Sequence, residues 1–103
     1  KLKILEIKKN FGWCDDSKSK FYNRQIKINN KIRHEKLCRK DKKYDLLIPI
    51  KYNSNKPKEN KGSAIFLHLT SNYKKTQGCI VIAKKDMLIL LKLINKQTKI
   101  RIL

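Results

Sequence analysis

The hydrophobic positions of this chain alternate with charged ones at both ends, and they form short apolar runs in between. The alternation over residues 1–9 and again over residues 98–103 predicts a strand at each end. Residues 10–24 mix turn-forming residues with aromatic ones and are expected to form an ordered loop. A short extended piece is expected at residues 25–28. The pattern over residues 32–39 does not distinguish a helical turn from irregular structure.

Two apolar runs in the second half predict the central strands. Residues 44–52 read as a strand, and Pro49 places it at a sheet edge or a bulge because proline has no N–H for the ladder. Residues 63–69 are almost continuously apolar, which is typical of a strand buried on both faces. Residues 78–82 form another extended apolar run. Polar, turn-rich loops are expected on either side of residues 63–69.

The clearest helix is predicted over residues 84–95. Met87, Leu88, Leu91 and Ile94 follow the spacing of one buried helical face, and Asp86 in the first turn suits the helix dipole. The fold class is therefore mostly β with one principal α-helix near the C-terminus. At 103 residues the chain fits a single domain, 1–103, and is too short for two independent cores.

Charge changes the range of partners to consider. Lys and Arg number 27 against 8 Asp and Glu, a formal charge of +19, and only four of the basic residues are Arg. A charge this high favours anionic polymers, although specific nucleic-acid recognition favours Arg over Lys. Lys, Ile and Asn have A/T-rich codons, so genome composition and a selected polyanion surface both remain open. No apolar run approaches the ~20 residues of a membrane helix.

Three cysteines and one histidine are the candidates for chemistry. Cys14, Cys38 and Cys79 are an odd number without paired-ligand spacing, which excludes a complete disulfide framework and suggests no zinc site. His68 lies inside an apolar run, and Cys79 follows a glycine, where backbone N–H groups can face the sulfur. A thiol, an imidazole and backbone donors are the groups that thiol acyl transfer needs. From spacing alone, one His and one Cys close in sequence are more often a core histidine and a buried, inert thiol.

The order of several sequence blocks resembles a known family. The blocks are Gly62-Ser63-Ala64-Ile65-Phe66-Leu67-His68, Thr76-Gln77-Gly78-Cys79-Ile80, the following helix and the last alternating segment. They resemble the L,D-transpeptidase (YkuD-like) catalytic domain. Upstream blocks resemble one branch of that family: Gly12-Trp13-Cys14-Asp15-Asp16, Tyr22-Asn23 and His34-Glu35. The resemblance implies a β-sandwich-like fold of which this chain would be the C-terminal portion, without the amino-terminal part.

The resemblance also implies a role for each site residue. Cys79 would be the nucleophile, His68 the base, and Gly78 would allow backbone N–H groups to approach the oxyanion. The expected substrate-binding residues are Thr76, Gln77 and His34. Cys14 is expected to be structural and Cys38 an incidental surface thiol.

The same resemblance implies the substrate and the location. The substrates would be peptidoglycan stem peptides, with an amine or water as acceptor, no metal or organic cofactor, and a place in the periplasm or cell envelope. Leu69 and Val81 stand where many members have Gly and Arg, which leaves the acceptor open. Two alternatives remain: a basic polyanion-binding module, and an inactive fragment of the family.

Overall fold

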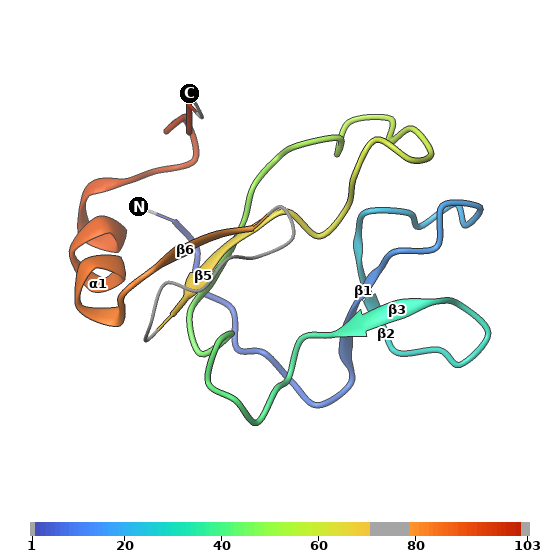
Figure 1. The fold of residues 1–103 in the computed structure, drawn as a ribbon, viewed down its shortest axis with the longest axis horizontal. Coiled ribbons are helices and arrows are strands. Elements are labelled where there is room, and N and C mark those ends of the chain that lie inside the picture. Colours follow the sequence, from blue (N-terminus) through green and yellow to red (C-terminus); the bar gives the residue numbers. More distant parts are fainter. Residues whose placement is uncertain (1, 71–78, 102–103) are drawn as a thin grey trace.

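A computed structural model describes residues 2–70 and 79–101, and in these residues the chain forms six short strands and one helix (Figure 1). The prediction of a mostly β fold with one helix near the C-terminus is confirmed. The elements are β1 (Phe11–Cys14), β2 (Gln25–Lys27), β3 (His34–Lys36), β4 (Leu47–Pro49), β5 (Phe66–Leu69), β6 (Ile80–Ile82) and α1 (Lys84–Leu93).

The first sheet has the order β2-β1-β3, and both of its pairs are antiparallel. Its central strand carries Gly12, which faces Ile26 on one side and Lys36 on the other. A Cβ atom at this position would lie 3.3 Å from the carbonyl oxygen of Glu35 and 3.2 Å from Cγ1 of Ile28. The absence of a side chain therefore allows β1 and β3 to approach closely.

The second sheet has the order β4-β5-β6, with β4 antiparallel and β6 parallel to β5. β4 is an edge strand, as Pro49 predicted. All four residues of β5 are buried, in agreement with the continuous apolar run that predicted this strand. Because β5 is central and buried on both faces, it separates two hydrophobic clusters.

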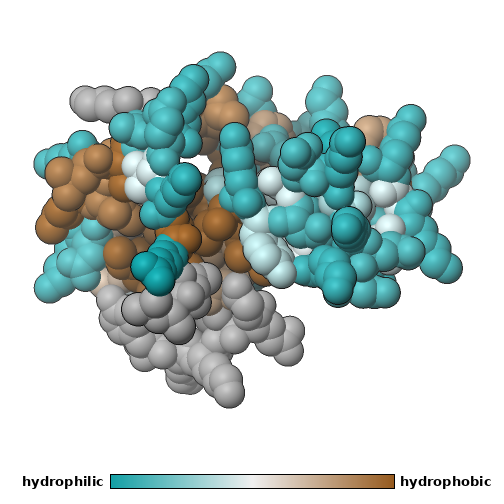
Figure 2. Space-filling view, turned by 90° about the horizontal axis from the view of Figure 1, so that it is seen from above, coloured by the Kyte–Doolittle hydropathy of each residue, from teal (hydrophilic) through white to brown (hydrophobic). Residues whose placement is uncertain are grey.

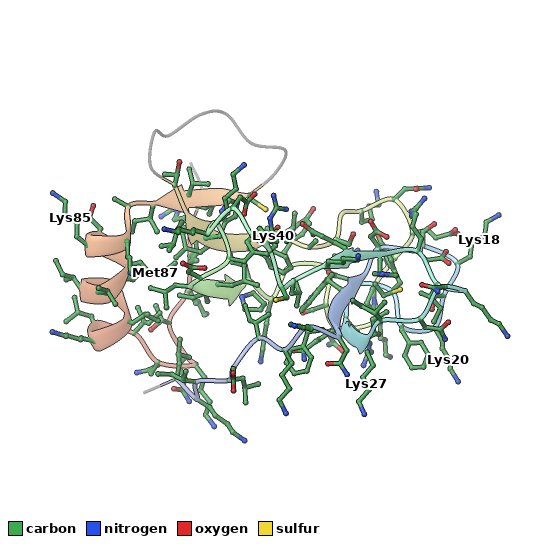
Figure 3. All side chains as sticks on the ribbon, turned by 90° about the horizontal axis from the view of Figure 1, so that it is seen from below. Lys18, Lys20, Lys27, Lys40, Lys85 and Met87 are labelled. Atoms are coloured by element: carbon green, nitrogen blue, oxygen red, sulfur yellow. The ribbon has the colours of Figure 1, made fainter. Side chains whose placement is uncertain are left out.

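Alternate residues of β5 enter different clusters. Phe66 packs with Leu37 and Tyr44, whereas Leu67 and Leu69 pack with Met87 of α1. Met87 is completely buried, and Figure 3 shows its side chain extending from α1 toward the sheet. The helix thus covers one face of the second sheet, and the cluster around Phe66 forms on the other face.

Three predictions from the hydrophobic pattern are wrong. Described residues 2–9 form no strand, and neither do described residues 98–101. The loop expected over residues 10–24 contains β1. Residues 32–39, which the pattern left undecided, contain β3. In each case the hydrophobic pattern indicates only on which side the apolar side chains lie. A strand also needs a neighbouring strand, elsewhere in the chain, with which to form hydrogen bonds.

The surface is divided by chemistry. In Figure 2 hydrophilic residues cover the half of the molecule that holds β1, β2 and β3, and apolar residues gather in the half that holds α1. Lys18, Lys20 and Lys27 extend outward from the hydrophilic half (Figure 3). Several large apolar side chains of α1 are exposed: Leu88, Ile89 and Leu93.

Candidate active site

His68 lies in the middle of β5 and is only 6% exposed. Its Nδ1 lies 3.1 Å from the carbonyl oxygen of Leu69. A carbonyl oxygen only accepts hydrogen bonds, so this contact assigns the ring hydrogen to Nδ1. In the neutral imidazole the lone pair is then at Nε2.

Cys79 directly precedes β6 and is partly buried. Its thiol donates a hydrogen bond of 3.4 Å to the carbonyl oxygen of Ala64, and its side chain packs against the cluster of Leu37, Tyr44 and Phe66. The candidate nucleophile is thus positioned by the segment that leads into β5. A resting thiol held in this way keeps its hydrogen directed at a fixed backbone atom.

The strand register places Cys79 and His68 on the same face of the second sheet. Leu67 pairs with Ile80, and His68 pairs with Val81. Continued by one residue, this register places Cys79 level with Phe66, two residues before His68 on β5. Side chains two residues apart along a strand lie on the same face of the sheet. Ideal strand spacing gives a Cα–Cα distance of roughly 8 Å for such a diagonal pair. The two apolar runs at residues 63–69 and 78–82 are thus neighbouring strands, and their pairing is parallel.

Tyr44 connects the two candidate residues. Its ring meets that of His68 edge-on with centroids 5.2 Å apart, and Cys79 packs against the same cluster. Burial raises the pKa of the Tyr44 phenol, and the hydrogen bond to Glu35 and the negative charge of that carboxylate act in the same direction. The phenol is thus held protonated, with its hydroxyl directed at Glu35.

Two charged residues, Glu35 and Arg39, contact Tyr44. Its hydroxyl donates to Oε1 of Glu35 over 2.6 Å, and the guanidinium of Arg39 lies over its ring at 5.0 Å. Arg39 also forms an ion pair with Asp41. The hydrogen bond that Arg39 donates to this carboxylate lowers the pKa of Asp41 to about 2. These residues fix the orientation of the tyrosine that borders the Cys–His pair.

The sequence-predicted binding residues have different outcomes. Thr76, Gln77 and Gly78 lie outside the described residues. His34 is in β3, where it pairs with Cys14 and its Nδ1 lies 2.7 Å from the carbonyl oxygen of Ile32. Adjacent residues of a strand face opposite sides, so His34 points away from the side on which Glu35 meets Tyr44. Its role in binding substrate remains a prediction.

The other two cysteines differ in exposure. Cys14 is fully buried in β1, and Cys38 is exposed. The structural role expected for Cys14 agrees with this burial, and the position of Cys38 fits a surface thiol. Across residues 2–70 and 79–101, no three His, Cys, Asp or Glu residues gather as metal ligands would.

A cavity of about 580 Å³ lies away from the Cys–His pair. Its walls combine the amino-terminal residues 2–7 with parts of β4 and its approach, and they include Tyr44 and Leu91. Neither His68 nor Cys79 lines it. The cavity therefore contains neither candidate reacting group, and the face of β5 and β6 is the candidate active site.

Sequence reasoning missed four residues that shape this site: Asn23, Glu35, Tyr44 and Ala64. Asn23, Glu35 and Ala64 belong to blocks that resemble the family, which was a usable signal. Tyr44 was interpreted only as the start of a strand, and nothing in the local pattern indicated its contact with His68.

The part of the chain that the structure describes contains no helix with the length and apolarity to span a bilayer.

Comparison with known proteins gives one match. The family model of the YkuD L,D-transpeptidase catalytic domain matches residues 2–102. No curated protein and no solved structure matches the chain. The match covers nearly the whole sequence, including the strand of His68 and the segment that carries Cys79. The chain belongs to the YkuD family of L,D-transpeptidase catalytic domains.

Proposed function

We propose that this protein is a cysteine-dependent acyltransferase that acts on peptidoglycan stem peptides. The observation that carries the proposal is the placement of Cys79 and His68 on one face of two paired strands, both in contact with the cluster around Tyr44. Family membership supplies the substrate class. The finer assignments of nucleophile, base and substrate are part of the proposal.

The first half of the reaction forms a thioester. Nε2 of His68 takes the thiol proton, and Sγ of Cys79 attacks the carbonyl carbon of a stem-peptide amide. The C–N bond of that amide breaks, and the departing amine receives the proton from His68. The enzyme then carries the acyl group on sulfur, and the imidazole is neutral again.

The second half transfers the acyl group. An amine from another stem peptide gives a proton to His68 and attacks the thioester carbon, so that a new amide forms and Cys79 leaves as the thiolate, which recovers the proton. Water in place of the amine gives hydrolysis. Backbone N–H groups at Gly78 and Cys79 are proposed to hold the oxyanion in both halves. We also propose a periplasmic or cell-envelope location, where this substrate occurs.

The direct test is acylation of Cys79. We expect mass spectrometry after incubation with a carbapenem to show one adduct, on Cys79, and turnover of a stem tetrapeptide to disappear in Cys79→Ala while the circular dichroism spectrum stays unchanged. Cys38→Ala is the matched control and should retain activity. Iodoacetamide should label Cys79 faster than Cys38, despite the greater exposure of Cys38. Equal labelling of all three thiols, or turnover by Cys79→Ala, would contradict the proposal.

A further inference from the structure

Asn23 is a buried polar residue that the proposed mechanism does not use. It is 4% exposed and adopts a left-handed backbone with φ of 58°. Its side-chain oxygen accepts hydrogen bonds from Nε1 of Trp13 at 2.9 Å and from the N–H of Ala64 at 3.1 Å. Its side-chain nitrogen donates to the carbonyl oxygens of Tyr52 at 2.9 Å and Asn53 at 2.7 Å.

The amide of Asn23 therefore uses all of its hydrogen-bonding capacity. An amide oxygen has two lone pairs and an amide nitrogen has two hydrogens, and here each has a partner. The four partners come from β1, from the segment after β4 and from the segment before β5. One side chain thus ties the first sheet to both flanks of the long connection between β4 and β5.

The contact with Ala64 leads directly to the candidate nucleophile. Ala64 has a φ of 53°, a conformation that costs an alanine of order 1 kcal/mol and persists only where the surroundings hold it. Its N–H is held by Asn23, and its carbonyl oxygen accepts the thiol hydrogen of Cys79 at 3.4 Å. The orientation of the acceptor of that thiol therefore depends on Asn23.

We propose that Asn23 is a positioning residue that sets the orientation of the Cys79 thiol through Ala64, an inference that rests on the proposed function for its activity measurements. It acts through its side-chain oxygen, which holds the N–H of Ala64. Its two N–H donors serve the connection after β4 and contribute to stability. The two halves of one amide thus have separable effects, and this separation makes the role testable.

The experiment compares Asn23→Ala with Asn23→Asp. Alanine removes the acceptor and both donors, whereas aspartate keeps an oxygen for the N–H of Ala64. We expect Asn23→Ala to lower kcat about tenfold or more with KM within about twofold, because small displacements of a nucleophile are costly. We expect its Cys79 alkylation rate to rise about fivefold, because the Ala64 carbonyl is no longer held in place as the acceptor of the thiol. Asn23→Asp should be less stable yet remain within about threefold of the original protein in both rates.

Two residues serve as controls. Asn60 also has a left-handed backbone, with φ of 61°, but is exposed, and Asn60→Ala should leave both rates within about twofold. Cys14, whose carbonyl oxygen accepts the backbone N–H of Asn23, reports local unfolding. It should stay slow to alkylate in every variant, whereas general loosening of this region would speed its labelling together with that of Cys79.

Each outcome decides one question. Original kcat in Asn23→Ala, or equal impairment of the alanine and aspartate variants with Cys14 still protected, overturns the inference. If the original protein forms no acyl adduct, the proposed function fails, and the alkylation rates still test the inference. If both variants unfold, hydrogen exchange in the original protein decides: the amide of Ala64 should be protected about a hundredfold, and protection below about fivefold overturns the inference.

Discussion

At the scale of single residues, the site depends on how buried polar groups are satisfied. His68 is buried in an apolar strand, as the sequence indicated, because the Leu69 carbonyl and the ring of Tyr44 accommodate its imidazole. The sequence identified His68 because it interrupts an apolar run, and Cys79 because it follows a glycine at the start of another. It did not identify Tyr44 or Asn23, since their contacts with His68 and Ala64 join residues 24 and 41 positions apart along the chain. Local patterns carry no information about such partners.

The phenol of Tyr44 gives a prediction about alkaline pH. Burial raises its pKa above the usual value near 10, so the phenol stays protonated where the unfolded chain would lose the proton. Its contribution to the free energy of unfolding is therefore complete below about pH 10 and falls as the pH rises further, by at most ~1.4 kcal/mol per pH unit. We expect this pH dependence to be shallower in Tyr44→Phe.

The measurement is urea unfolding of both proteins at a series of pH values from 9 to 11.5. Tyr52→Phe is the control, since Tyr52 is 52% exposed and its removal should leave the slope unchanged. At neutral pH Tyr44→Phe should also lose about 1–3 kcal/mol, because Glu35 loses its donor. Identical slopes for the original protein and Tyr44→Phe would argue against the shift.

At the scale of elements, the sequence predicted best those that burial defines. β5 was predicted because it is apolar apart from His68. α1 was predicted because Met87 and Leu91 recur at helical spacing, although Leu88 of the predicted buried face is 47% exposed. β1 was missed because its four residues are surrounded by turn formers, and it is a strand owing to its position between β2 and β3. The alternating residues 2–7 have the right pattern and form no strand, since the described residues give them no ladder partner.

The packing of α1 gives a second stability prediction. Met87 is fully buried against Leu67 and Leu69, so Met87→Ala should lower the free energy of unfolding by about 2–5 kcal/mol. Leu93→Ala is the matched control in the same helix, because Leu93 is 75% exposed, and its effect should stay within about 0.5 kcal/mol. Urea denaturation compares the two, and similar losses would disprove this packing of the helix.

At the scale of the whole molecule, the surface is more apolar at the end that holds α1 than at the other end. The hydrophilic half carries β1, β2 and β3, while the cluster around Met87 stabilises the other half (Figure 2). The sequence predicted the net charge but not this difference between the two ends, because the lysines are dispersed along the chain. The parallel pairing of β5 and β6 was equally inaccessible to local patterns, since the direction of a neighbouring strand depends on the path of the chain between them.

The charge predicts how the protein binds polyanions. The net charge of +19, which is carried mostly by lysine side chains, should attract DNA, RNA and anionic polysaccharides. This attraction should not depend on the sequence of the nucleic acid. We expect the affinity for a random-sequence duplex to fall by at least about tenfold between 50 and 200 mM salt. Fluorescence anisotropy measures this, with heparin as the competitor. A preference of a thousandfold or more for one nucleic-acid sequence would instead support a dedicated nucleic-acid-binding module.

The parallel arrangement of β5 and β6 has a consequence for the chain before it is folded. Two antiparallel strands can be joined by a tight hairpin. Before a parallel pair such as β5 and β6 can form, the connecting chain must return along the whole length of the first strand. Cys79 and His68 therefore come to lie on one face of the sheet only once this return has been completed. A nascent or partly assembled chain carries an ordinary sulfhydryl, and any reactivity of that sulfhydryl arises together with the finished sheet.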